Sequence, residues 1–206
     1  MQKDIFIVNT NNKNATPLFG LLSAEFLSLL GNQITAVAIP VLVLEYTHSP
    51  IAAGFAGAGA VLPIVFSALI GGRIIDTFGA VKSSFGADLM SFLSVLVLPL
   101  ALIHFTDIPV ITIFFLVFLG ALFDPTGVTA RQTMLPEPVR LSKRDLGQIN
   151  GYRGALENGA DLLGPAIRGL LIAIIGIVNT FFINAASFWA CAMILYITVP
   201  DKTTLH

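Results

Sequence analysis

The chain has 206 residues, of which 55% are hydrophobic and only 11% are charged, and its mean hydropathy is +0.86. Soluble domains carry about 25% charged residues, so this composition argues against a water-soluble globule. A net charge of −1 provides no basic excess to attract nucleic acid, and the single cysteine, Cys191, allows neither a disulfide framework nor a cysteine metal cluster, so we expect no nucleic-acid partner, metal or cofactor.

Long apolar runs divide the chain into a polar tail, six predicted membrane spans and a short polar end. A helix that crosses about 30 Å of hydrocarbon needs about 20 predominantly apolar residues. The tail comprises residues 1–16, the bundle 17–199 and the end 200–206. The runs of sufficient length are residues 17–45, 51–75, 84–104, 109–130, 149–175 and 178–199. We therefore predict an all-α membrane protein with six transmembrane helices.

The basic residues outside these spans fall on one side of the membrane when the loops are counted in order. They are Lys3, Lys13, Lys82, Arg131, Arg140, Lys143, Arg144 and Lys202, and the opposite loops carry none. Loops rich in lysine and arginine stay in the cytoplasm. We therefore expect a multi-pass protein of the cell membrane with both ends of the chain in the cytoplasm.

Polar residues gather on one face of the first span and on one face of the fifth. The fifth span carries Asn150, Arg153, Glu157, Asp161, Gly164 and Arg168 within one arc, and the first carries Glu25, Ser28, Asn32 and Thr35 at helical spacing. Charged groups inside a membrane must face protein or water, since an unpaired charge there costs on the order of 2.5 kcal/mol or more. We predict that these two faces line one polar cavity, with Ser28, Asn32, Thr35, Asn150, Arg153 and Arg168 in its wall.

Five intramembrane carboxylates are candidates for coupling to protons or substrate: Glu25, Asp88, Asp124, Glu157 and Asp161. Glu25 has no cation near it in the sequence, which favours a role in proton exchange. The spacing also allows purely structural roles for the others. Arg153 can pair with Glu157 and Arg168 with Asp161, Asp124 shares a helix face with Arg131, and Asp88 lies where a capping or snorkelling side chain is common.

The segment that follows the second span resembles the signature loop of the major facilitator superfamily. Gly72, Asp76, Gly79 and Lys82 match its pattern of glycine, three residues, aspartate, then glycine and a basic residue. Thr77, Ala80 and Val81 stand where the family usually has basic residues. The resemblance implies a cytoplasmic gate formed by the four matching residues together with Arg131.

Two further segments carry the resemblance. Residues 159–169 are similar to the glycine and proline signature of the fifth helix in the superfamily's antiporters, with Gly159, Gly164, Pro165 and Gly169 in place and Arg168 replacing a glycine. Leu122-Phe123-Asp124-Pro125, followed by Ala130-Arg131-Gln132 and Leu135-Pro136, resembles the multidrug and siderophore exporters of the macrolide-efflux branch.

This resemblance implies one half of a transporter built from two six-helix bundles, each an inverted repeat of three helices. It further implies export of a small amphipathic or cationic molecule by alternating access, with proton antiport, and a second six-helix half that is either a C-terminal half or another copy. The sequence has no phosphate-binding loop and no histidine beside an intramembrane serine, so we predict neither an ATP-driven pump nor an enzyme. A non-transporting scaffold or an inactive truncated half stays as the alternative.

Overall fold

The computed structural model describes residues 15–59, 61–105 and 108–199, and within these ranges the secondary structure is entirely helical. The predicted tail and end therefore lie almost wholly outside the described residues. The helices are α1 (Thr16–Thr47), α2 (Pro50–Gly59), α3 (Val61–Phe78), α4 (Ala80–His104), α5 (Val110–Leu122), α6 (Asp124–Met134), α7 (Pro136–Leu141), α8 (Leu146–Ile175) and α9 (Ile177–Thr198).

Six segments in the described part of the chain are long and apolar enough to cross a membrane, which confirms the predicted fold class. Four are the single helices α1, α4, α8 and α9. The other two are composite, with α2 and α3 together spanning Pro50–Phe78 and α5 to α7 spanning Val110–Leu141. The predicted run 109–130 is thus divided at Phe123, and Pro125 stands in the first turn of α6.

Tight turns join the spans where the backbone can adopt a left-handed conformation. Gly176 has φ +79° and ends α8 immediately before α9, and Gly79 has φ +82° between α3 and α4. Glycine adopts such angles without a steric cost, so a single residue reverses the chain at each point. At the start of α8, Asp145 accepts a hydrogen bond from the Gln148 backbone N–H, a standard N-terminal cap.

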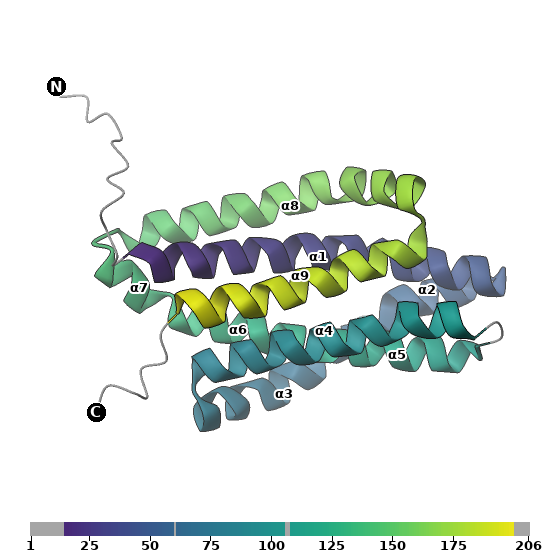
Figure 1. Cartoon of the computed structure of the whole chain (residues 1–206), viewed down its shortest axis with the longest axis horizontal. Coiled ribbons are helices and arrows are strands. Elements are labelled where there is room, and N and C mark those ends of the chain that lie inside the picture. Colours follow the sequence, from purple (N-terminus) through teal and green to yellow (C-terminus); the bar gives the residue numbers. More distant parts are fainter. Residues whose placement is uncertain (1–14, 60, 106–107, 200–206) are drawn as a thin grey trace.

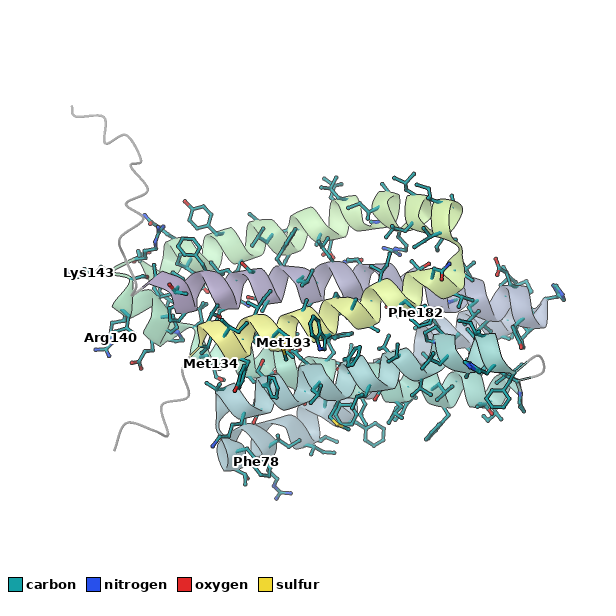
Figure 2. The ribbon with its side chains drawn as sticks, viewed as in Figure 1. Phe78, Met134, Arg140, Lys143, Phe182 and Met193 are labelled. Carbon is teal, nitrogen blue, oxygen red and sulfur yellow. The ribbon has the colours of Figure 1, made fainter. Side chains whose placement is uncertain are left out.

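The long helices run side by side, with α9 between α1 and α4 (Figure 1). Helix α8 lies on the outer side of α1, while α3, α5 and α6 lie against α4 on the other side of the bundle. Helix α1 begins, and α9 ends, at the same end of the bundle (Figure 1). Figure 2 shows Arg140 and Lys143 at this end as well, beside α7.

Large apolar side chains cover much of the outer surface (Figure 2). Ile51, Phe55, Leu69 and Leu162 are all more than 70% exposed. The interior instead holds many small polar groups, since Ser84, Ser91 and Thr180 are completely buried. This arrangement fits a hydrocarbon solvent, because lipid solvates apolar side chains while polar groups must find partners inside the protein.

Candidate substrate cavity

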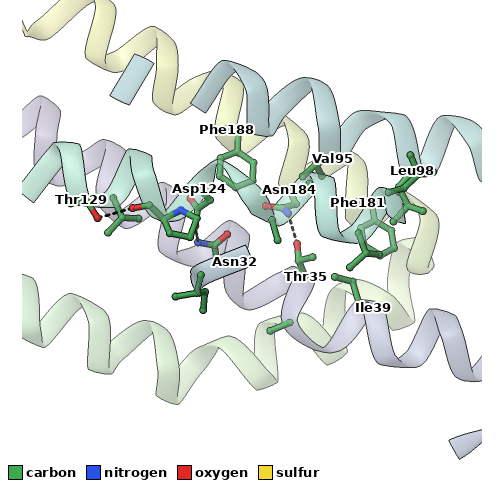
Figure 3. Close-up of a pocket in the computed structure, with 18 of the residues that line it drawn as sticks. Asn32, Thr35, Ile39, Val95, Leu98, Asp124, Thr129, Phe181, Asn184 and Phe188 are labelled. Carbon is green, nitrogen blue, oxygen red and sulfur yellow. Dashed lines mark hydrogen bonds between the residues drawn. The ribbon is translucent and has the colours of Figure 1, made fainter. Parts of the chain in front are cut away.

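A cavity of about 480 Å³ opens between α1, α3, α4, α5, α6 and α9 (Figure 3). Most of its wall is apolar, and Phe181 and Phe188 of α9 contribute aromatic rings. The polar residues in its wall are Asn32, Thr35, Asp124, Thr129, Gln132 and Asn184. Asp124 is the one charged residue among the described residues that line it. An apolar chamber with a few convergent polar groups is the usual form of a small-molecule site.

Asp124 is positioned by the break between α5 and α6. It is the first residue of α6, and the positive end of a helix dipole favours a negative charge there. Its two carboxylate oxygens accept hydrogen bonds from α1: Ser28 Oγ donates to Oδ1 at 3.0 Å and Asn32 Nδ2 donates to Oδ2 at 2.7 Å. Figure 3 shows Asn32 and Asp124 facing each other at the cavity.

A buried ion pair lies directly behind this carboxylate. Arg131 Nη1 of α6 donates to both oxygens of Asp88 of α4, at 2.8 and 2.9 Å, and both side chains are almost completely inaccessible. Arg131 Nη2 donates to Ser28 Oγ at 3.1 Å, so the serine hydroxyl connects the ion pair to Asp124. Gly127 allows the close approach, because a Cβ atom there would lie 3.2 Å from Asp88 Oδ1. Spacing predicted an ion pair of Arg131 with Asp124 and a capping or snorkelling role for Asp88. The structure instead pairs Arg131 with Asp88.

The polar face of α8 packs against α1 and is not among the residues that line this cavity. Glu25 forms a two-pronged ion pair with Arg153, whose Nε donates to Oε2 at 2.7 Å and whose Nη2 donates to Oε1. The predicted pair of Arg153 and Glu157 also forms, as a longer ion pair of 3.9 Å to the same guanidinium. Glu25 has no cation near it in the sequence, and its partner is therefore an arginine from α8.

A second contact between α1 and α8 is built on Gln33, a residue that the sequence interpretation missed. Its amide nitrogen donates to Asp161, and its amide oxygen accepts from Arg168 Nη2 at 3.2 Å. The predicted pair of Asp161 and Arg168 is thus bridged by a neutral amide. Gly164 makes room for this amide, since a Cβ atom there would lie 2.9 Å from the Gln33 Cβ.

The remaining predicted residues are more dispersed. Asn32 and Thr35 line the cavity, whereas Ser28 lies behind it and Asn150 is exposed on α8. Gly72, Asp76, Gly79 and Lys82 lie around the turn from α3 to α4 and are exposed there, while Arg131 is buried with Asp88. Gly159, Pro165 and Gly169 are not closely covered, and a Cβ atom at either glycine would meet nothing within 4 Å.

Asn184 is a further cavity residue that the sequence interpretation missed. It donates to Thr35 Oγ1 and is almost fully buried. The available signal was an amide inside the apolar run 178–199, since such a group needs a partner from another helix. The described residues contain no cluster of three or more metal-ligating side chains.

Six membrane-length segments, five of which line a largely apolar chamber with a few polar groups, define a multi-pass membrane protein. The chain belongs to the major facilitator superfamily, whose sequence profile matches residues 21–206. It is 39% identical to the multidrug efflux pump Tap of Mycolicibacterium fortuitum over 206 residues, covering 95% of this chain and 50% of the pump.

Other relatives support the same exporter branch. The multidrug efflux pump Tap of Mycobacterium tuberculosis (strain ATCC 25618 / H37Rv) is 36% identical over 86% of this chain and 43% of its own length. The staphyloferrin A transporter of Staphylococcus aureus is 25% identical over 88% of this chain and 45% of its own length. No solved structure gives a significant match. The chain spans about half the length of these curated relatives.

Proposed function

We propose that this chain forms one six-helix half of an exporter that moves a small amphipathic cation across the cell membrane by alternating access. The observation that carries the proposal is the position of Asp124, the one charged residue in the described wall of a largely apolar cavity. An apolar wall with aromatic rings suits the body of an amphipathic molecule, and the carboxylate suits its charge.

The charges around the cavity support exchange of a cation for a proton. Asp88 and Asp124 together carry two acidic groups, whereas Arg131 is the one cation bonded into their hydrogen-bond network in the described chain. One negative charge is therefore unmatched when both acids are ionised, and an unmatched charge in a membrane interior is costly. Either a proton or a substrate cation removes that cost, so the two are alternatives at one carboxylate. Proton entry down a membrane potential supplies about 2.3 kcal/mol per 100 mV.

The other carboxylates predicted to couple transport differ from Asp124 in their partners or in their exposure. Glu25 is bonded to Arg153, so its negative charge is already balanced by a guanidinium. Asp161 is held by Gln33, and Glu157 is more exposed than Glu25. We therefore place the exchange at Asp124, and we assign Glu25 and Arg153 to holding α1 against α8.

We also propose that both ends of the chain face the cytoplasm and that a second six-helix half completes the transporter. The position of Arg140 and Lys143 at the end where α1 begins and α9 ends supports this orientation (Figure 2). The length of the relatives supports a second half, supplied by a C-terminal half or another copy. Asp76, Gly79 and Lys82, beside Gly72, would then form the cytoplasmic gate against that half.

Transport in everted membrane vesicles tests the proposal. We would express the chain, impose an inward-acid pH gradient and follow uptake of a fluorescent organic cation. Asp124→Asn should reduce gradient-driven uptake at least about tenfold, because the charged counter-ion is lost. Glu45→Gln, at an exposed position near the end of α1, serves as the control. Unchanged uptake with Asp124→Asn would overturn Asp124 as the exchange site, and the same assay with Glu25→Gln tests the role predicted for Glu25.

A further inference from the structure

The two oxygens of the Asp124 carboxylate have different surroundings. Oδ2 accepts from Asn32, which lines the cavity beside it, whereas Oδ1 accepts from Ser28, which is buried behind the wall. Because an ionised carboxylate can only accept hydrogen bonds, Asn32 must present its NH₂ group to Oδ2. The carboxylate therefore has a front, turned to the cavity, and a back, turned to the protein interior.

The back of the carboxylate is fixed. The Ser28 hydroxyl donates its one proton to Asp124 and accepts from Arg131 Nη2. Arg131 is in turn bound to Asp88, which is fully buried. A ligand that took the place of Ser28 at Oδ1 would have to move a buried hydroxyl that is also bonded to this ion pair.

The front of the carboxylate is open to exchange. Asn32 is partly exposed at the cavity, and its hydrogen bond to Asp124 is the side-chain bond that the structure records for its amide nitrogen. A ligand cation that approaches Asp124 from the cavity therefore meets the Asn32 amide in the place where its own charge should lie. To take the same acceptor position on Oδ2 it must displace that amide.

We propose that the Asn32 amide competes with the ligand for Oδ2 of Asp124, and that a ligand N–H group replaces its hydrogen bond. The site therefore selects protonated amines over quaternary cations. This inference rests on the proposed function, since it specifies the substrate at the same carboxylate. A protonated amine exchanges one N–H donor for another at Oδ2. A quaternary ammonium ion that displaces the amide brings no N–H group, so it leaves a desolvated carboxylate oxygen without its donor, and leaving a buried acceptor unsatisfied is costly.

Calorimetric titration of the purified chain in lipid nanodiscs tests this selection with a matched pair of probes. Benzyldimethylammonium carries one N–H group, and benzyltrimethylammonium replaces its hydrogen with a methyl group. At neutral pH we expect the amine to bind about tenfold more tightly than the quaternary ion. Asn32→Ala should tighten amine binding by about tenfold, because no internal donor has to be displaced. Asn158→Ala, which removes an exposed amide of α8 that does not line the cavity, should leave amine binding unchanged.

The outcomes separate the two proposals. If the wild type binds both probes with equal affinity, the proposed selection is overturned. If Asp124→Asn also abolishes binding of both probes, the cation site itself is supported. Binding that survives Asp124→Asn would overturn the proposed function, and absence of binding to the wild type would overturn both. Should Asn32→Ala fail to fold, the comparison of the two probes on the wild type decides the question without a variant.

Discussion

Arg131 of α6 and Asp88 of α4 form a buried ion pair in the membrane-spanning part of the bundle, 43 residues apart in the chain. The guanidinium holds both carboxylate oxygens and also reaches Ser28 of α1. One side chain thereby ties together three helices that surround the cavity. Since each partner is surrounded by protein, neither can turn to water if the other is removed.

Removal of one partner of this pair should be strongly destabilising. For Asp88→Asn we expect a loss of about 3–5 kcal/mol in the free energy of unfolding, because the Arg131 charge is left buried without its counter-ion. The measurement is unfolding in mixed micelles, followed by circular dichroism. Asp76→Asn, at an exposed carboxylate beside the α3 to α4 turn, is the control and should stay close to wild type. A loss no larger than that of the control would contradict the assignment.

The contact between Glu25 and Arg153 should appear as an energetic coupling between α1 and α8. A double-mutant cycle with Glu25→Gln and Arg153→Gln should give a coupling of about 1–3 kcal/mol in the free energy of unfolding. The cycle of Arg153→Gln with Glu157→Gln should give well under half of that value, because Glu157 lies 3.9 Å away and is more exposed. Equal couplings in the two cycles would show that Arg153 does not prefer Glu25.

The three glycines of the α8 motif should respond differently to alanine. Gly164→Ala should destabilise the protein by about 1–3 kcal/mol, because its new methyl group would collide with the Gln33 side chain. Gly159→Ala and Gly169→Ala should instead be neutral or gain up to about 1 kcal/mol, since both positions are open and alanine is the better helix former. Unfolding midpoints of the three variants provide the measurement, and a loss at all three positions would contradict this account.

Cys191 should not react with a thiol reagent in the folded protein. It is completely buried on α9, and its thiol lies 3.0 Å from the Ala24 carbonyl oxygen on α1. Because the chain has one cysteine, mass spectrometry after maleimide treatment reports this site alone. We expect labelling only after unfolding in sodium dodecyl sulfate. Rapid labelling of the native protein would show that α1 and α9 are not packed as described.

Because Cys191 should not react, cysteines introduced elsewhere can report the orientation of the chain in the membrane. Lys143→Cys, between α7 and α8, should react with a membrane-impermeant maleimide in everted vesicles but not in intact cells. Ser49→Cys, between α1 and α2, should show the opposite pattern. The proposed orientation is falsified if the two positions label from the sides opposite to these.

The sequence by itself determined the number of spans and the class of protein. The free energy of transferring a helix from water into hydrocarbon is a sum over the residues of that helix. Runs such as 84–104 and 178–199 therefore identify membrane helices without knowledge of the helices they pack against. The same reasoning identified Asp88 and Asp124 as unusual intramembrane acids. The observed helices α4 and α9 differ from these two runs by only a few residues at their ends.

Only the tertiary structure decided which charges meet. Local spacing predicted the ion pair of Arg153 with Glu157, which forms at 3.9 Å, but not the closer partner Glu25 from α1. Spacing also suggested Asp124 as the partner of Arg131, which instead pairs with Asp88 of α4. The polar face of α1 is likewise divided, with Glu25 turned to α8 and Asn32 turned to the cavity. The physical reason is that hydropathy adds along the chain, while pairing depends on helices that are distant in sequence and adjacent in space.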